Sequence, residues 1–353
     1  MRTSRILLIA LCAVAVQLGV DGSRAFVRDP VLEDMTAAAR LAKRAMEILK
    51  EESVKRGIAI DHGTDPNETG LIGAEYSDLT TTLGSLESKR TSTNPNFAGI
   101  VVEMLHRAGA KQGEQVAVSL SGSFPALNVA VFSALQVLKL RPILISSVGA
   151  SAYGANDPEW TWLDMERSLR EREVFPYASR AASLGGIAEG GGGLGEHGIL
   201  MGLAAIHRNG VRHLDERGSA TLGNDIKIHV SLYESELGRE KLAAFINVGG
   251  SLTSLGECRD AGSLPVGLVL KLPRSTCPGR GLISQMAEKG VPVIHLLNIR
   301  RIATRYGLPV DPIPLPPVPD GKAMRPGKYS LPVVLTGLVV LLAALSLEFR
   351  KKD

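Results

Sequence analysis

The chain has 353 residues, of which 44% are hydrophobic, 22% are charged and 4% are aromatic. This composition is too apolar for a disordered chain, and the chain is long enough to bury one large core or two smaller ones. The formal net charge is only +4 and aromatic side chains that could stack on bases are few, so nucleic acid is not an expected partner.

Both ends of the chain are apolar. Residues 1–25 combine a basic start, an apolar run and small residues, which predicts either a cleaved signal peptide or a retained N-terminal membrane anchor. Residues 331–347 predict a C-terminal transmembrane helix with a basic cytoplasmic tail at 348–353, and the alternative is a buried core helix. Because basic residues favour the cytoplasmic side, we expect the main domain on the extracytoplasmic side of the cell membrane, periplasmic or outer, with the lipid bilayer as a partner.

Residues 29–57 predict a helix that stands off from the membrane as a stalk. Asp29 is a capping residue before Pro30, a favoured first helical residue, and the basic residues Lys55 and Arg56 followed by Gly57 end the helix. After the main domain in the sequence, residues 309–330 are rich in proline and predict an extended connector.

Residues 58–308 alternate between short apolar segments and amphipathic segments. The predicted strands are 115–120, 142–147, 179–184, 242–248 and 291–297. The predicted helices are 94–109, 125–138, 157–169, 199–208, 222–237, 282–289 and 300–306. This alternation predicts an α/β domain whose mostly parallel sheet has helices on both faces.

Small and polar residues follow three of the predicted strands. They are Ser119, Ser121, Gly122 and Ser123 at the first strand, Asn156 and Asp157 in the loop after the second, and Gly249 and Gly250 after the fourth. The carboxyl ends of parallel strands meet at one edge of a sheet, where glycine lets a ligand approach the backbone and serine supplies hydroxyl groups. The pattern predicts a site for a phosphate, a carboxylate or a sugar phosphate. The alternative is that these residues only form tight turns and cap helices.

A second polar stretch lies earlier in the chain, within residues 61–96. It offers hydroxyls, amides and two cations, namely Thr80, Thr81, Thr82, Lys89, Arg90 and Asn94. Such a set suits an anion or a polar polymer. The alternative is a hydrated loop whose hydroxyls bond to their own backbone.

An alternative hypothesis is catalysis, with Ser121 or Ser123 as the nucleophile and His295 as the base. The chain would then be a hydrolase or a transferase. The sequence around Ser121 lacks the Gly-x-Ser-x-Gly pattern of a nucleophile elbow, and a histidine among apolar residues is commonly a core residue. The sequence therefore favours binding over catalysis and leaves the question open.

Neither a metal nor a cofactor is expected from the sequence. The run Gly190–Gly193 lacks the spacing of a phosphate-binding fingerprint, and no cysteine or histidine spacing suits zinc. Cys258 and Cys277 fall in one irregular stretch, where they either form a disulfide or remain two thiols.

Several long strings together resemble the poly-gamma-glutamate system protein family. They are TTTLGSLESKRTSTNPNFA (80–98), SLSGSFPALN (119–128), SSVGASAYGANDPEWTWLDME (146–166), NVGG (247–250), VPVIHLLNI (291–299) and YGLPVDPIPLP (306–316). The resemblance spans residues 35–316 and carries no catalytic signature. It implies a bacterial accessory protein that accompanies a ligase and membrane components, which make and export poly-gamma-glutamate as a capsule or exopolymer.

The leading hypothesis is therefore a membrane-anchored accessory protein of poly-gamma-glutamate synthesis or export. It would bind the polymer, or organise the membrane synthase and export components of the same system, through its serine-, glycine- and threonine-rich loops. Two alternatives are a hydrolase or transferase that trims or modifies the polymer, and a phosphosugar-binding α/β domain.

Overall fold

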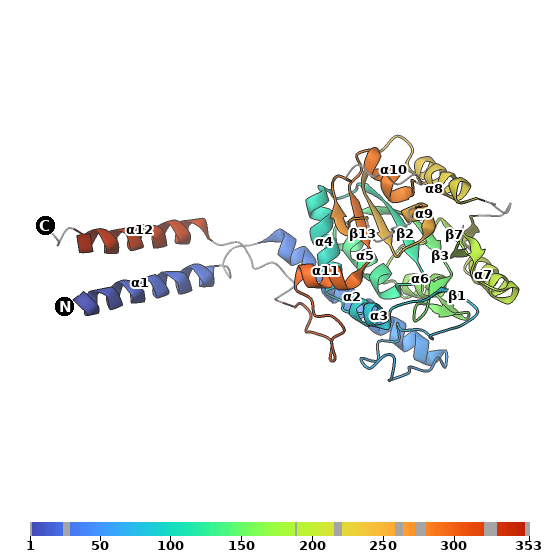
Figure 1. Ribbon diagram of the computed structural model, residues 1–353, viewed down its shortest axis with the longest axis horizontal. Coiled ribbons are helices and arrows are strands. Elements are labelled where there is room, and N and C mark those ends of the chain that lie inside the picture. Colours follow the sequence, from blue (N-terminus) through green and yellow to red (C-terminus); the bar gives the residue numbers. More distant parts are fainter. Residues whose placement is uncertain are drawn as a thin grey trace. The chain divides into compact units, whose positions relative to one another are not determined.

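The computed structural model describes residues 2–23, 29–187, 189–214, 221–257, 264–272, 280–320 and 330–349. The chain divides into two units (Figure 1). The first unit is Met1–Glu33 with Met324–Asp353, and the second is Asp34–Ala323. The second unit contains the whole of the central sheet.

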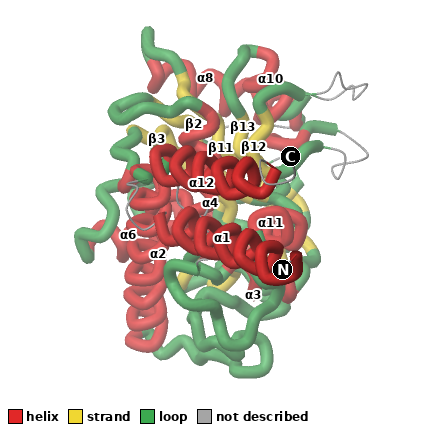
Figure 2. Tube along the Cα trace, turned by 90° about the vertical axis from the view of Figure 1, so that its left-hand side faces the viewer, coloured by secondary structure: helices red, strands yellow, loops and turns green. Residues whose placement is uncertain are grey.

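The first unit contains two helices that lie side by side, α1 (Arg2–Ser23) and α12 (Leu331–Phe349), as Figures 1 and 2 show. They approach closely at Gly337, where a Cβ atom would lie 2.6 Å from Cγ1 of Val16. Among the described residues, neither of these helices nor any other is long and apolar enough to cross a membrane. The prediction that hydrophobic membrane segments flank the domain is therefore wrong, because the helices at both ends fall short of what a span requires.

The predicted stalk forms a helix, α2 (Pro30–Lys55), which begins where the capping pattern places it. Asp29 Oδ1 accepts a hydrogen bond from the backbone N–H of Val31 at 3.2 Å. One stripe of the helix is buried, namely Met35, Ala38, Ala39, Ala42, Ala45, Met46, Leu49 and Ser53. These small and apolar side chains are part of the core of the second unit.

The central sheet has seven strands in the order β10-β7-β3-β2-β11-β13-β12. In chain order they are β2 (Gln115–Ser121), β3 (Arg141–Ser147), β7 (Ala181–Ser183), β10 (Arg212–His213), β11 (Leu242–Val248), β12 (Gly267–Val269) and β13 (Val293–Leu296). All neighbours are parallel except β12 and β13, which are antiparallel. The prediction of an α/β fold with a mostly parallel sheet is confirmed.

The other helices and the short strands of the second unit are not part of this sheet. The helices of the second unit are α3 (Leu86–Ser92), α4 (Phe97–Ala108), α5 (Pro125–Val137), α6 (Trp162–Glu171), α7 (Glu196–Arg208), α8 (Leu222–Leu237), α9 (Leu252–Leu255), α10 (Leu282–Glu288) and α11 (Ile299–Tyr306). The short strands outside the sheet are β1 (Thr80–Thr82), β4 (Ala150–Ser151), β5 (Asn156–Asp157), β6 (Trp160–Thr161), β8 (Gly185–Gly186) and β9 (Gly190–Gly192).

The central strand β2 shows why the sheet is covered on both faces. All seven of its residues are buried, so both sets of alternating side chains are covered. Ala117 packs with residues of α8 and α10, including Tyr233 and Met286, in one apolar cluster. Val116 and Val118 alternate with Ala117 and are equally buried. The apolar run Val116–Val118 suits a strand that is covered on both faces, and the buried serines Ser119 and Ser121 follow toward its carboxyl end.

The strand order reverses between β2 and β11. From β2 the chain adds β3, β7 and β10 on one side, and it then returns to add β11 on the other side of β2. In open α/β sheets, ligands bind outside the carboxyl ends of the strands at such a reversal. The fold therefore favours the ends of β2 and β11 as the place for a site.

The predicted connector is held against the second unit as far as the structure describes it. Asn67 donates to the carbonyl oxygen of Pro312 at 2.8 Å and accepts from the N–H of Leu315 at 3.2 Å. Asn96 donates to the carbonyl oxygen of Pro317 at 3.0 Å and accepts from the N–H of Asp320 at 2.9 Å. Two asparagines thus satisfy backbone groups of a segment whose prolines cannot donate to a sheet.

Asp164 is expected to be a main stabilising residue between α6 and α7. Its carboxylate accepts from Arg208, Asn209 and the Thr161 hydroxyl at 2.6–2.9 Å, and its side chain is 1% exposed. Burial alone would raise the pKa of Asp164, but these hydrogen bonds lower it overall. Replacing Asp164 by Asn should reduce the free energy of unfolding by about 3 kcal/mol, because the partly buried Arg208 loses its partner.

Urea unfolding of Asp164→Asn and of the control Glu171→Gln would measure this effect. Glu171 lies on the same helix and its side chain is 66% exposed in its pair with Arg167, so little change is expected there. Equal unfolding free energies for the two variants would contradict the assigned role of Asp164.

Candidate functional site

A cleft of about 520 Å³ lies at the carboxyl ends of β2 and β11. Its described lining residues are Thr81, Thr82, Leu83, Gly84, Ser85, Ser88, Lys89, Ser121, Ser123, Phe124, Ser147, Gly149, Ser151, Gly186, Ile187, Gly250, Ser251, Leu252, Leu297, Asn298 and Ile299. Nine of these described residues carry a hydroxyl group, and Lys89 alone among them is charged. The cleft therefore offers many neutral hydrogen-bond partners and a single cation.

The turn after β2 is fixed by its own hydrogen bonds. Ser121 Oγ accepts from the N–H of Ser123 at 3.1 Å, and the Asn128 amide donates to the carbonyl oxygen of Ser121 at 3.0 Å. A Cβ atom at Gly122 would lie only 2.6 Å from the carbonyl oxygen of Val148. Because only glycine fits this approach, the ends of β2 and β3 form one continuous surface.

The loop after β11 packs against the same turn. Gly249 has a φ of +92°, and a Cβ atom there would lie 3.0 Å from Cβ of Ser121. Ser251 Oγ then accepts from the N–H of Ser254 at 3.2 Å and caps α9. The predicted meeting of these strand ends at one edge is confirmed.

Buried polar side chains lie beneath the cleft. A small cavity of about 10 Å³ shares Ser121, Ser147 and Ser251 with the cleft and reaches Glu189 and His229 below them. Glu189 accepts hydrogen bonds from buried hydroxyls, those of Ser183 and Thr253. Burial lowers the pKa of His229, and its ring nitrogens have no hydrogen-bond partner among the described residues. These groups are enclosed in a space that holds at most one water, so they support the cleft from below.

Lys89 is the most unusual side chain of the cleft. It is 2% exposed, and its Nζ donates to Ser151 Oγ at 2.8 Å and to the carbonyl oxygen of Ser123. Nζ also lies 4.1 Å from the centre of the Phe124 ring. In the part of the chain that the structure describes, Lys89 forms no ion pair. Burial lowers its pKa from 10.5 to about 7, so the charged and neutral forms are both populated near neutral pH.

Comparison of the chain with family models, with curated proteins and with solved structures gives no match. The resemblance described above therefore stays a prediction. The chemistry of the cleft carries the functional argument instead.

Six of the residues predicted from the sequence line this cleft. They are Thr81, Thr82, Lys89, Ser121, Ser123 and Gly250. They come from β1 and α3 in the polar stretch and from the ends of β2 and β11, and the sequence alone could not place these segments side by side. Ser119, Gly122 and Gly249 lie directly beside them: the Ser119 hydroxyl contacts Ser254 Oγ at 3.5 Å, and the two glycines shape the turns.

Asn156 and Thr80 form a structural clamp away from the cleft lining. The Asn156 amide accepts from the N–H of Ala74 at 3.1 Å and donates to its carbonyl oxygen at 2.8 Å and to the Thr80 hydroxyl at 2.9 Å. Asp157 accepts from the N–H of Glu159 at 2.8 Å in the turn between β5 and β6. This hairpin also explains why the helix predicted from residue 157 begins only at Trp162.

Arg90 and Asn94 also bond to the protein itself. The Arg90 guanidinium donates to the carbonyl oxygens of Thr64 and Gly63, both at 2.8 Å, and pairs with Asp311 at 3.3 Å. Asn94 is fully buried and accepts from the N–H of Asn96 at 3.0 Å. Neither residue is among those that line the cleft.

His295 lies on β13 and is fully buried. Its Nδ1 lies 3.0 Å from the Asn247 amide nitrogen, and burial lowers its pKa to about 4. His295 is therefore neutral at pH 7, and it is absent from the residues that line the cleft. The structure does not bring it together with Ser121 or Ser123 at that surface.

Sequence reasoning missed several residues of the cleft, above all Ser151 and Asn298. Ser151 lies inside the loop after the second predicted strand, where only the residues at positions 156 and 157 were singled out. Asn298 directly follows a predicted strand, has a φ of +52° and caps α11 through its side chain. The strand-end rule would have found Asn298, whereas Ser151 depends on the pairing of β4 with β1.

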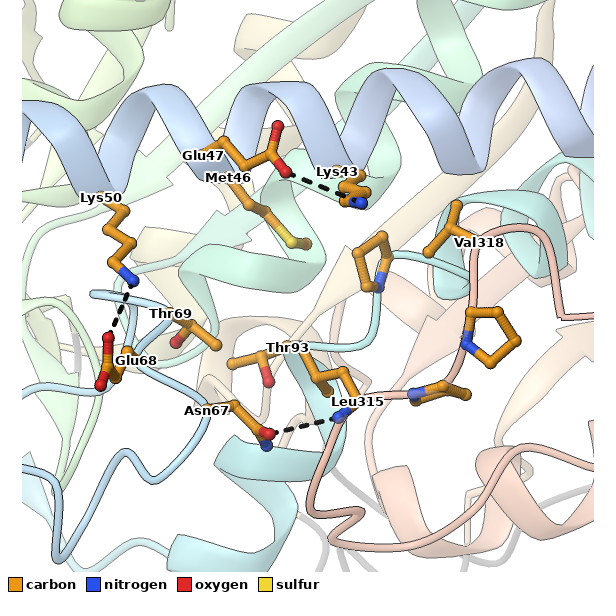
Figure 3. A pocket seen from close by; sticks show the side chains of 13 residues that line it. Lys43, Met46, Glu47, Lys50, Asn67, Glu68, Thr69, Thr93, Leu315 and Val318 are labelled. Atoms are coloured by element: carbon orange, nitrogen blue, oxygen red, sulfur yellow. Dashed lines mark hydrogen bonds and ion pairs between the residues drawn. The ribbon is translucent and has the colours of Figure 1, made fainter.

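A second cavity, of about 410 Å³, lies between α2 and the proline-rich segment (Figure 3). Its charged side chains pair with one another, Lys43 with Glu47 at 3.8 Å and Lys50 with Glu68 at 3.3 Å. Figure 3 also shows Asn67 bonded to the backbone at Leu315. Since its polar groups are already satisfied, this groove offers a ligand less than the cleft does.

The described residues contain no group of three or more His, Cys, Asp or Glu side chains placed to hold a metal ion. Cys258 and Cys277 lie outside the described residues, so their pairing stays a prediction.

Proposed function

We propose that the chain is an accessory protein of poly-gamma-glutamate synthesis or export and that it holds a segment of the polymer in the cleft. Each unit of this polymer carries one free carboxylate and one amide. Hydroxyls donate hydrogen bonds to carboxylates and accept them from amide N–H groups, so a hydroxyl-lined cleft suits both groups of the repeat. The observation that supports the proposal is the cluster of nine hydroxyls around one cation at the reversal of the strand order.

The chemistry of the cleft favours weak and reversible binding of the polymer. Lys89 supplies at most one positive charge, and its pKa of about 7 makes that charge partial at neutral pH. Neutral hydrogen bonds contribute roughly 1 kcal/mol each in water, which is less than bonds between charged groups. A protein that passes a growing polymer onward needs such weak binding, because tight binding would hold the polymer in place.

Replacing Ser88 by Trp is expected to block the cleft and weaken oligomer binding by about tenfold or more, or ~1.4 kcal/mol. Ser88 lines the cleft from α3 and is only partly buried, so a larger side chain extends into the cavity. Fluorescence anisotropy of a labelled γ-linked glutamate oligomer would measure binding to the full-length chain.

Ser235→Trp is the matched control, because Ser235 is exposed on α8 and does not line the cleft. An α-linked oligomer of equal length separates recognition of the γ-linkage from simple charge attraction. Equal affinities for wild type and Ser88→Trp would contradict binding in the cleft.

We further propose that the second unit works outside the cytoplasm beside the synthase and export components. The membrane segments that first suggested this location are not borne out, so the proposal rests on the resemblance, which implies that the chain accompanies membrane components that export the polymer. Modification of the protein in intact cells by an amine reagent that does not cross membranes would support this location, and protection of the protein would contradict it.

A further inference from the structure

Ser151 and Lys89 form a contact that the binding function does not need. Ser151 Oγ lies 2.8 Å from Lys89 Nζ, and both residues line the cleft. Ser151 is held in place by its backbone, because its N–H donates to Ser123 Oγ at 2.9 Å and its carbonyl oxygen accepts from the N–H of Gly154 at 2.9 Å. The hydroxyl is thus fixed at the cleft with an amine in direct contact.

We propose that Ser151 and Lys89 are a nucleophile and its general base, and that they hydrolyse an amide bond of a chain held in the cleft. The inference rests on the proposed function for its substrate, a γ-linked glutamate chain. A nucleophile and a base within hydrogen-bond distance, at the wall of a substrate-sized cavity, are the geometry that covalent catalysis of this kind requires.

A lysine acts as a base only when it is neutral, and the surroundings of Lys89 favour that form. Burial lowers its pKa to about 7. The atoms around Nζ are the Ser123 carbonyl oxygen, the Ser151 hydroxyl and the Phe124 ring, and none of them is a carboxylate. The neutral amine can therefore accept the proton of the Ser151 hydroxyl.

Charged side chains on the neighbouring elements are engaged elsewhere or exposed. On α3 and α11, Glu87 pairs with Arg300, Arg90 pairs with Asp311, Arg305 donates to the carbonyl oxygen of Val266, and Arg301 is exposed. The short strands β1 and β4 contribute only Thr, Ala and Ser. No carboxylate among the described lining residues holds Lys89 in its charged form.

The reaction balances with water as the only co-reactant. Ser151 Oγ forms a bond to the amide carbonyl carbon while its proton moves to Lys89 Nζ. The C–N bond then breaks, and Lys89 returns the proton to the leaving nitrogen, which leaves a free amine and an ester on Ser151. Water attacks the ester, its proton passes through Lys89 to Ser151 Oγ, and a carboxylic acid is released.

A fluorophosphonate probe tests the pair without any assumption about the substrate. In the full-length protein, we expect an adduct on Ser151, identified by mass spectrometry, whose rate of formation rises with pH and levels off above about pH 7. Ser151→Ala should carry no adduct, and Lys89→Met should react about 100-fold more slowly. Ser235→Ala, a hydroxyl variant on the exposed face of α8 and outside the cleft, should react at the wild-type rate.

Absence of an adduct on Ser151, or an unchanged rate in Lys89→Met, would overturn the assignment. The same proteins are then incubated with the γ-linked oligomer. We expect wild type to shorten it and release new amino ends, and Ser151→Ala to bind it without shortening it. Binding without shortening by wild type would overturn the hydrolysis and leave the proposed function standing. Labelling of Ser151 without oligomer binding would instead contradict the proposed function and this substrate.

Discussion

Replacing Lys89 by methionine is expected to remove a marked rise in folding stability between about pH 7 and pH 10. Burial lowers the pKa of Lys89 from 10.5 to about 7. Between these values the unfolded chain binds a proton on Lys89 that the folded chain does not bind, so raising the pH favours the folded state. The penalty from Lys89 is therefore largest below about pH 7 and disappears above about pH 10.5.

The slope of this dependence is about 1.4 kcal/mol for each pH unit. Methionine has a similar length and needs no proton, although it loses the hydrogen bonds to Ser123 and Ser151. We expect Lys89→Met to be more stable than wild type at pH 7 by about 2 kcal/mol, after the lost hydrogen bonds are included.

Urea unfolding at several pH values would measure both effects, with Lys227→Met as the control on the exposed side of α8. The control should show the same rise in the free energy of unfolding with pH as wild type. If Lys89→Met also shows this rise, Lys89 is charged in the folded protein, and the basis for a lysine base at the cleft is removed.

Replacing Asn156 by alanine is expected to reduce the free energy of unfolding by about 3 kcal/mol. The Asn156 side chain is fully buried and satisfies both the N–H and the carbonyl oxygen of Ala74. Alanine leaves these two backbone groups, and the buried Thr80 hydroxyl, without their partner. The loss should appear as a lower urea midpoint, while the folded fraction keeps its affinity for the γ-linked oligomer.

Asp157→Ala is the matched control for this variant. Asp157 is the next residue, is only partly buried and makes one local turn contact, so its loss should cost less than about 1 kcal/mol. A stable Asn156→Ala protein that has lost oligomer binding would show that Asn156 acts on the ligand, in contradiction to the clamp described here.

The sequence predicts the sheet and the edge that carries the cleft because both follow from local rules. Apolar runs separated by helical patterns indicate parallel strands, and parallel strands bring their carboxyl ends to one edge. Ser121 and Gly250 were found in this way. The strand β10 was missed because it has only two residues and no apolar run, and β12 was missed because Pro265 and Gly267 interrupt the apolar run around it.

The roles of individual polar residues were harder to predict. Arg90, Asn94 and Asn156 have the same donor and acceptor chemistry as a ligand site, yet each bonds to the protein's own backbone. Composition cannot show which way a polar side chain points. Ser151 was missed for the opposite reason, since its place beside Lys89 depends on a contact between residues far apart in the chain.

The membrane segments were predicted from apolar composition alone. Both end segments do form helices, but within the described residues no helix meets the length and apolarity that a span requires. The apolar composition thus correctly indicated helices at the two ends, but it wrongly indicated that these helices span a membrane.

Photocrosslinking of a γ-linked glutamate oligomer to the full-length protein tests most directly whether the cleft binds the polymer. The oligomer would carry a diazirine, and the modified residues would be identified by mass spectrometry. We predict crosslinks on α3, in the loop after β11 and at residues 297–299, which all border the cleft. Crosslinks confined to other surfaces, such as the groove between α2 and the proline-rich segment, would contradict the account.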